Sequence, residues 1–261
     1  MGLRRIATWS ATLAVALAGV VALPGVWSGS SEAHAAAVPV GARQLFVGNF
    51  DSRNFCQWAT VQNRVANTPG CAYDQGFYGL QVQSDGSAHP TAARFEVRDG
   101  DIPEFGGGER AEVRAPQVMD VREGDERWYE FSYKFGSTFT NPSSWFVVMQ
   151  WHAGSGSPPL ALEVATDGTL QLVNNRGEAP RRTIGAIKRG TWVRYVLHVK
   201  FSNDPAVGFA EVYQDGKLVV GRHSRKTMAG EVGYLKTGIY RDVGERATAV
   251  LWQDGLRVTA P

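Results

Sequence analysis

Short runs of alternating apolar and polar residues, separated by glycine and proline, dominate this chain. The clearest run extends from Trp192 to Phe201, where every second residue from Val193 onward is apolar. Alternate side chains of a β-strand lie on the same face, so this pattern predicts a strand with one buried face. No stretch shows a helical apolar period sustained over ten residues. The chain is therefore expected to fold into sheets.

The same pattern predicts strands elsewhere in the chain. They span Gly79 to Gln83, Ala93 to Val97, Arg110 to Arg114, Trp128 to Phe135, Phe146 to His152, Leu160 to Ala165, Leu170 to Asn174, Ala210 to Tyr213, Leu218 to Val220, Tyr234 to Tyr240 and Ala249 to Val258, the last broken at Asp254-Gly255. Asp215-Gly216 signals a hairpin. Short helices are open alternatives near Asp51 to Trp58 and Pro116 to Arg122. Many short, half-buried strands predict an all-β jelly-roll β-sandwich, whose concave sheet would form a groove for a long ligand.

The first 35 residues differ in character from the rest. Arg4 and Arg5 precede an apolar run, and Ala33-His34-Ala35 fits the cleavage pattern of a secretory signal peptide. We predict a signal peptide at 1–35, an N-terminal extension at 36–49 and one domain at 50–261. An uncleaved anchor is the alternative, and the export route stays open. No later segment approaches the ~18 apolar residues of a membrane span, so we expect a secreted protein without membrane association.

The chain has two cysteines, Cys56 and Cys71. An even number of cysteines in an exported chain predicts a disulfide between them, with two free thiols as the alternative. No metal ligands are assigned and no cofactor is expected. Calcium stays open because Asp74, Asp99 and Asp101 could supply oxygen ligands, although no complete calcium-loop motif is present.

Three predicted strands carry polar side chains at every second position and apolar or small side chains between them. The polar residues are Arg110, Glu112 and Arg114 in the first strand, Gln150 and His152 in the second, and Tyr234, Lys236 and Tyr240 in the third. Together they provide cations, an amide, an imidazole and phenols. This set is suited to binding a carboxylated sugar and abstracting a proton from it. Trp151 has the opposite phase and is expected in the core. Core positions are also favoured for Trp145, Trp192 and Trp252, with stacking on sugars as the alternative.

The motifs Arg-x-Glu-x-Arg, Gln-x-His and Tyr-x-Lys-x-Gly-x-Tyr, in this order, resemble the signature strands of the jelly-roll polysaccharide lyases. Within this group the set is similar to that of alginate lyases, glucuronan lyases and heparin-lyase-I-like enzymes. Gly106-Gly107-Gly108-Glu109-Arg110 also fits, and the resemblance spans roughly Phe50 to Val258. It implies β-elimination at a 4-linked uronic acid, in which a base removes the C5 proton and an acid protonates the leaving C4 oxygen.

The resemblance implies that Arg110, Gln150, His152 and Tyr240 are catalytic. Arg110 and Gln150 would mask the sugar carboxylate. Tyr240 would transfer protons, with His152 as the alternative base. In mannuronate and glucuronate the C5 proton and the C4 oxygen lie on the same side, so Tyr240 could serve both roles. In guluronate and iduronate they lie on opposite sides, and His152 would take the proton.

The predicted substrate-binding residues are Glu112, Arg114, Tyr234, Lys236 and Arg241. Arg241 directly follows Tyr240, so it contributes only if the strand ends there. The net charge of +2 is too small to identify a partner, and any polyanion must be held by a local patch. We expect a monomer that binds an acidic polysaccharide and no nucleic acid. Which uronan is bound, and whether cleavage is internal or terminal, stays open.

Two other functional classes remain open at this point. A non-catalytic carbohydrate-binding module could share the fold but would not need Gln150, His152 and Tyr240 near one sugar. A glycoside hydrolase would need two carboxyl groups flanking the bond. Glu109 and Glu112 are at odd spacing and therefore lie on opposite faces of a strand, whereas Glu163 is expected on a neighbouring strand.

Overall fold

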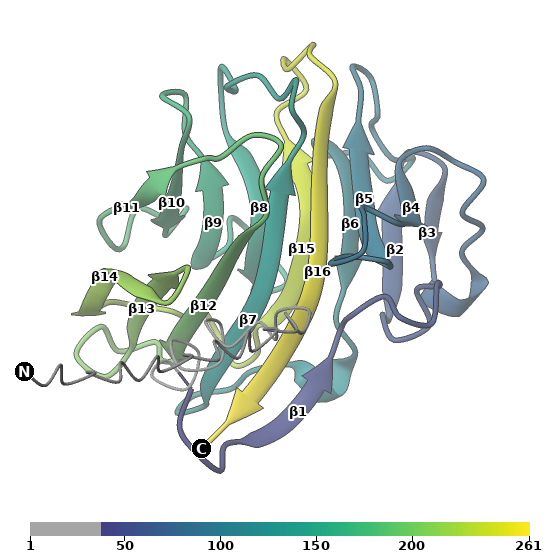
Figure 1. The fold of residues 1–261 in the computed structure, drawn as a ribbon. Coiled ribbons are helices and arrows are strands. Elements are labelled where there is room, and N and C mark those ends of the chain that lie inside the picture. Colours follow the sequence, from purple (N-terminus) through teal and green to yellow (C-terminus); the bar gives the residue numbers. More distant parts are fainter. Residues whose placement is uncertain (1–37) are drawn as a thin grey trace, which may run out of the picture.

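Residues 38–261 are described by the computed structural model, and they form sixteen β-strands and two short 3-10 helices. The strands build two stacked sheets in which hydrogen-bonded neighbours are antiparallel. Figure 1 shows the two layers. The predicted all-β sandwich is confirmed.

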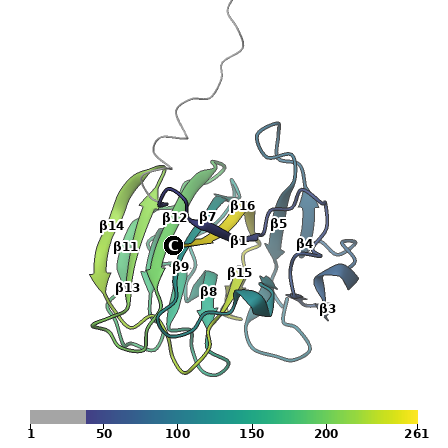
Figure 2. The same cartoon turned by 90° about the horizontal axis from the view of Figure 1, so that it is seen from below.

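Each sheet contains eight strands, here called sheet A and sheet B. Sheet A has the spatial order β14 (Lys217–Ser224), β13 (Phe209–Gln214), β12 (Val193–Lys200), β7 (Glu126–Phe135), β16 (Ala249–Ala260), β5 (Ala92–Val97) and β4 (Leu80–Gln83), with β1 (Arg43–Val47) paired to β16. Sheet B has the order β11 (Arg182–Ala186), β10 (Thr169–Val173), β9 (Leu160–Val164), β8 (Phe146–His152), β15 (Tyr234–Arg241), β6 (Glu109–Arg114), β2 (Thr60–Asn63) and β3 (Ala66–Thr68). The sheets come together at the edge where β11 meets β14 (Figure 2).

The three motif strands are neighbours in the middle of sheet B, although they are far apart in the sequence. β15 lies between β8 and β6. Lys236 pairs with Gln150 on one side and with Arg114 on the other, and Tyr240 pairs with Arg110. Hydrogen-bonded strands lie about 4.8 Å apart, so this register brings the polar side chains of all three motifs onto one small area.

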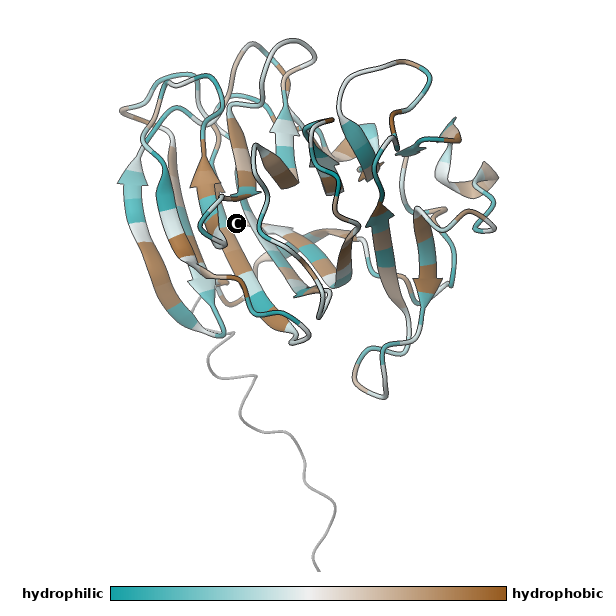
Figure 3. Cartoon of the chain, turned by 90° about the horizontal axis from the view of Figure 1, so that it is seen from above, coloured by the Kyte–Doolittle hydropathy of each residue, from teal (hydrophilic) through white to brown (hydrophobic). Residues whose placement is uncertain are grey.

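The inner faces of the two sheets form the core. Hydrophobic and hydrophilic residues succeed each other along the strands (Figure 3), as half-buried strands require. Trp151 is buried against Tyr129 at a ring-centroid distance of 4.8 Å, so its predicted core position is confirmed. A polar contact also links the sheets, because the Tyr133 hydroxyl lies 2.7 Å from Oγ1 of Thr237.

The strands predicted from alternation are present, with small shifts at their ends. The predicted hairpin is confirmed, since Asp215 and Gly216 have φ of 49° and 78° between paired strands. The predicted break in the last strand is a register shift after Asp254. Strands β1, β2, β3 and β11 were not predicted, because they are short and have no clear alternation. The segment Asp51 to Trp58 contains no helix, whereas a 3-10 helix forms at Gln117–Met119.

Cys56 and Cys71 form the predicted disulfide. It closes a loop of 15 residues that leads into β2 and β3 and back to the 3-10 helix Gly70–Ala72. The predicted signal peptide at 1–35 lies outside the described residues, as do the first two residues of the predicted extension. Among residues 38–261, no helix has the length and apolar character needed to cross a membrane.

Replacing both Cys56 and Cys71 by serine is expected to lower the free energy of unfolding by about 3 kcal/mol, because the open chain regains the entropy of a 15-residue loop. Both cysteines are exposed, so the serines bring no burial cost. Guanidinium titration of the variant, with the reduced wild type as control, measures the difference. Equal midpoints for oxidised wild type and variant would contradict this expectation.

Candidate active site

The carboxylate of Glu112 is the centre of the polar face of sheet B. Its Oε1 accepts a hydrogen bond from Nε2 of Gln150 at 2.7 Å, and its Oε2 accepts one from Nζ of Lys236 at 2.5 Å. Nη1 of Arg110 lies 3.5 Å from the same Oε2. Glu112 is only 2% exposed. The prediction that it binds substrate is therefore corrected, because it is occupied by three neighbours from three strands and organises them.

Lys236 is almost completely enclosed by this arrangement. Burial lowers the pKa of Lys236, and the adjacent Glu112 carboxylate counteracts that effect. A buried ammonium is retained in the charged form by a paired carboxylate, and the pair is costly to break from either side. Lys236 thus contributes a fixed positive charge next to the tyrosine of the same strand, with Nζ 5.9 Å from the centroid of the Tyr240 ring.

Tyr240 is held between a cation and an aromatic ring. The guanidinium carbon of Arg110 lies 4.1 Å from the centroid of the Tyr240 ring, a cation–π distance. Trp145 packs edge-on against the same ring at 4.7 Å between centroids. These contacts fix the ring while the side chain stays half-buried. Arg110 and Tyr240, predicted to act together, are brought into contact.

The glycine run before β6 allows the chain to pass directly over these two residues. Gly107 has φ of 89°, and a Cβ there would lie 2.7 Å from Nη2 of Arg110. At Gly108 a Cβ would lie 2.8 Å from Cε2 of Tyr240 and 2.3 Å from the carbonyl oxygen of Arg241. Any larger residue at these positions would displace the backbone or the site side chains.

His152 is held in one tautomer by its neighbours. The backbone N–H of Gly154 donates to Nδ1 of His152 at 3.0 Å, so Nδ1 must be an acceptor. The Tyr234 hydroxyl, 3.1 Å away, therefore donates to the same nitrogen. The neutral ring then carries its proton on Nε2. Burial and the nearby Lys236 charge lower the pKa of His152 from its ordinary value of 6.5, which favours this neutral form.

Arg114 lies beside Tyr234 at the end of the polar face. Its guanidinium carbon is 4.5 Å from the centroid of the Tyr234 ring, and Nη2 is 3.4 Å from Oδ2 of Asp120. Arg114 is partly exposed. The polar area that begins at Arg110 and Tyr240 therefore continues over five further residues, namely Arg114, Tyr234, His152, Gln150 and Lys236.

A groove of about 550 Å³ opens over this face. It is lined by Trp145, Val147, His152, Gly156, Ser157, Pro158, Glu163, Asn175, Arg181 and Tyr240. His152 and Tyr240 thus face one common space. The assignment of Trp145 to the core was wrong, because its side chain is 36% exposed and lines the groove.

Asn175 and Arg181 are groove residues that sequence reasoning missed. Buried Glu163 of β9 holds both of them, accepting from Nδ2 of Asn175 at 2.5 Å and from Nη1 of Arg181 at 2.8 Å. They lie in the connection between β10 and β11, which carries no motif and no alternation. The salt bridge shows that Glu163 neutralises a cation and leaves no free carboxylate pair of the kind a hydrolase requires.

Arg241 does not reach the groove. Its side chain is buried, with Nε donating to Oε2 of Glu109 at 2.7 Å and Nη1 donating to the carbonyl of Ala247. β15 continues through Arg241 in strand phase, so consecutive side chains point to opposite faces. The predicted substrate-binding role of Arg241 is therefore corrected to a structural one behind the site.

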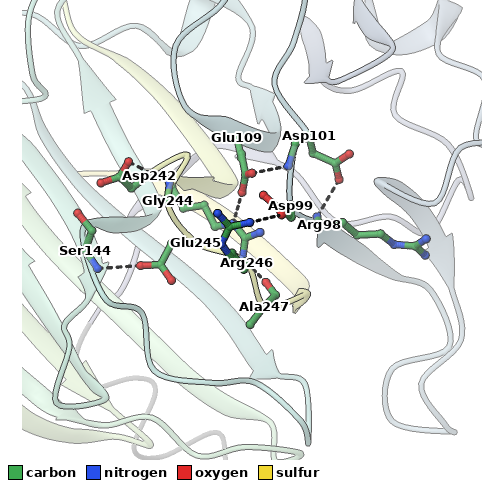
Figure 4. Close-up of polar contacts among 12 residues, drawn as sticks. Arg98, Asp99, Asp101, Glu109, Ser144, Asp242, Gly244, Glu245, Arg246 and Ala247 are labelled. Carbon is green, nitrogen blue, oxygen red and sulfur yellow. Dashed lines mark hydrogen bonds and ion pairs between the residues drawn. The ribbon is translucent and has the colours of Figure 1, made fainter.

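A second network behind the site positions Trp145. Oε1 of Glu245 accepts the backbone N–H groups of Ser143 and Ser144 at 2.6 and 2.7 Å. The N–H of Asp242 donates to the carbonyl oxygen of Trp145 at 3.2 Å. Figure 4 shows Glu245 and Ser144 in contact, with Glu109, Arg246 and Ala247 nearby. The segment after β15 therefore ties down the loop that carries the tryptophan.

The aspartates considered as calcium ligands have protein partners. Asp101 accepts hydrogen bonds from the Tyr78 hydroxyl and the Arg98 N–H, and Asp99 pairs with Arg246. Asp74 accepts the N–H of Gly76. Within residues 38–261 no group of three or more His, Cys, Asp and Glu side chains is arranged to hold a metal ion.

A family model described as polysaccharide lyase matches residues 52–257. The chain belongs to the polysaccharide lyase family. No curated protein matches this lyase. Its fold is similar to that of an endo-β-1,4-glucuronan lyase from the fungus Trichoderma reesei, with 16% identity, a TM-score of 0.61, and coverage of 84% of this chain and 96% of that one.

Two solved alginate lyases also share the fold of this polysaccharide lyase. One, from polysaccharide lyase family 7, is 19% identical with a TM-score of 0.57, covering 79% of this chain and 95% of that one. The other, from Corynebacterium sp., is 14% identical with a TM-score of 0.56, covering 80% and 99%. Family membership makes the protein an enzyme of the lyase class, which excludes a purely non-catalytic module.

Replacing Glu112 by glutamine is expected to lower the free energy of unfolding by about 3 kcal/mol, because Lys236 loses its buried counter-charge. The double variant Glu112→Gln/Lys236→Met should recover part of this loss, since it removes the unpaired ammonium. Guanidinium titration measures the free energy of unfolding of the single and double variants, and Glu231→Gln, at an exposed position, is the control. A double variant no more stable than Glu112→Gln alone would contradict the argument.

Proposed function

We propose that this lyase cleaves a 4-linked, uronic-acid-containing polysaccharide by β-elimination and leaves a 4,5-unsaturated uronate end. The observation that carries the proposal is the gathering of Arg110, Gln150, His152 and Tyr240 on one face of sheet B, around the Glu112 carboxylate. The printed names of the similar structures, a glucuronan lyase and alginate lyases, support the same substrate class.

The first requirement of the reaction is to mask the sugar carboxylate, because the adjacent C5 proton is lost only if further negative charge can be tolerated. Arg110 supplies a guanidinium with planar donors. Glu112 accepts one N–H of the Gln150 amide and thereby fixes the orientation of the amide, with its nitrogen towards Glu112. The second N–H of the same nitrogen is then available to the sugar. Prearranged donors of this kind are the largest expected contribution to the rate.

The second requirement is proton transfer, which we assign to Tyr240. In the tautomer that its Nδ1 contacts require, His152 carries the proton on Nε2, so it can donate to developing negative charge but cannot accept a proton there. Arg110 and Lys236 lie beside the Tyr240 ring and place positive charge next to the reacting sugar. Tyr240 as the phenolate would take the C5 proton. As the phenol it would then protonate the leaving C4 oxygen, while the C4–O bond breaks, the C4–C5 double bond forms and the phenolate is restored. This favours a sugar with the C5 proton and the C4 oxygen on the same side, namely glucuronate or mannuronate.

We further propose that the enzyme is exported, acts as a monomer on an acidic polysaccharide, and needs no cofactor. The disulfide supports export, because such bonds persist in oxidising compartments. The donors supplied by Arg110 and Gln150 can mask the carboxylate without a metal ion.

The Tyr240→Phe variant is expected to lose at least about a thousandfold in kcat while it still binds the polymer, because the ring contacts remain and only the proton carrier is removed. Ultraviolet absorbance of the unsaturated product on glucuronan, mannuronan and guluronan measures activity, and calorimetry measures binding. Tyr213→Phe, on the outer face of sheet A, is the matched control. Full turnover by Tyr240→Phe would reject the assignment.

The pH dependence of kcat/KM tests the role of neutral His152. Its pKa is lowered from 6.5. Protonation would put a proton on Nδ1, which could then no longer accept the hydrogen bonds from Gly154 and Tyr234 that hold the ring, so the acid limb is expected below pH 6.5. Lys236 is one cause of this lowering, and the Lys236→Met variant should therefore shift the acid limb to higher pH. A pH–rate series for wild type and variant on the best uronan measures the shift. A limb that stays in place, or moves to lower pH, would contradict the assignment.

A further inference from the structure

A second cavity of about 360 Å³ lies on the other side of Arg110 from the groove. Its walls are the turn between β2 and β3, at 63–67, and the loop segment 103–105 that precedes the glycine run. The volume falls in the range of small-ligand sites. No part of the reaction described above uses this cavity.

The cavity has an exposed apolar residue on each of its two wall segments. Phe105 is 49% exposed and Val65 is 61% exposed, and both line the same space. Together they give the cavity apolar surface that a ligand could cover. The Phe105 ring also contacts the site directly, with the Arg110 guanidinium carbon 5.1 Å from its centroid. Phe105 therefore connects the cavity to the residue that would hold the sugar carboxylate.

The order of strands in sheet B places the cavity and the groove in line. The groove lies over β8 and β9, Tyr240 and Arg110 lie on β15 and β6, and the cavity begins at β2. Four strand spacings of about 4.8 Å separate β9 from β2, which is a path of about 19 Å. A ligand that crosses the strands along this path would be an oligosaccharide with the reacting bond in its middle.

One cation at the rim of the cavity is weakly held. Nη1 of Arg64 lies 3.9 Å from Oδ1 of Asp101, and the Arg64 side chain is 56% exposed. The same Asp101 oxygen accepts the Tyr78 hydroxyl at 2.7 Å. Arg64 also forms a hydrogen bond with Tyr78, and its exposed guanidinium would exchange these contacts for a ligand anion. Glu104 also lines the cavity, so its net charge is near zero and apolar contact with Phe105 must supply much of the recognition.

We propose that this cavity binds the sugar residues of the acidic polysaccharide that lie beyond Arg110, with Phe105 as the apolar platform and Arg64 as the partner of a neighbouring uronate carboxylate. Sugars then occupy both sides of Tyr240, and the enzyme cuts within chains. This inference rests on the proposed function, because the polymer is the same one that reacts at Tyr240.

The experiment compares long and short substrates in Phe105→Ala and Arg64→Ala. The readout is kcat/KM on the polymer divided by kcat/KM on the shortest oligomer that is cleaved. The ratio should fall about tenfold in each variant, equivalent to about 1.4 kcal/mol. Arg222→Ala is the matched control, because Arg222 is also 56% exposed with one acidic partner, Glu211, but lies on sheet A. Thermal midpoints equal to wild type exclude a folding defect.

An unchanged ratio in both variants, or an equal fall in Arg222→Ala, overturns the role of the cavity. Products released one terminal unit at a time by the wild type would also overturn it. If the wild type forms no unsaturated product from any uronan, the proposed function fails instead. Calorimetric binding of uronan oligomers then still tests the cavity, because affinities of Phe105→Ala and Arg64→Ala equal to that of the wild type would reject it.

Discussion

The site depends on one buried carboxylate. Glu112 is surrounded by Arg110 of its own strand and by Gln150 and Lys236 of the two neighbouring strands, so a single negative charge holds together two cations and an amide. Without it, the two cations would repel each other in a medium of low dielectric constant. With it, two cations and one carboxylate leave the cluster with an excess positive charge beside Tyr240, which lines the groove. The same carboxylate fixes the positions of the donors that an acidic sugar would meet, although it is itself only 2% exposed.

Rigidity of the tyrosine follows from packing on both of its sides. Arg110 covers one part of the Tyr240 ring and Trp145 the other, while the glycine run passes so close that a single Cβ would collide with it. Further back, the ion pair of Arg241 with Glu109 and the contacts of Glu245 with Ser143 and Ser144 anchor the loops that supply these neighbours. Preorganisation of this kind lets a phenol act without a large rearrangement at the moment of reaction.

The groove and the second cavity lie on opposite sides of the site along sheet B, and their walls differ in chemistry. On the side of β9, Glu163 fixes Arg181 and Asn175 at the wall of the groove. On the side of β2, recognition relies on exposed apolar side chains and one loosely paired arginine. Charged side chains would therefore orient the polymer near the reacting bond and on the β9 side. On the β2 side, apolar contacts would extend the binding.

The sequence by itself determined the strands with clear alternation, the hairpin at Asp215-Gly216, the disulfide, and the phase of the motif residues, because these are local properties of a pleated chain. It also identified Arg110, Gln150, His152 and Tyr240 as residues of one face. Only the tertiary structure decided that Glu112 is buried, that Arg241 turns inward, and that Trp145, Asn175 and Arg181 line the groove. Those outcomes depend on which strands become neighbours and how their connecting loops fold back. Contacts between residues more than a hundred positions apart, such as Glu112 with Lys236, leave no local pattern in the sequence.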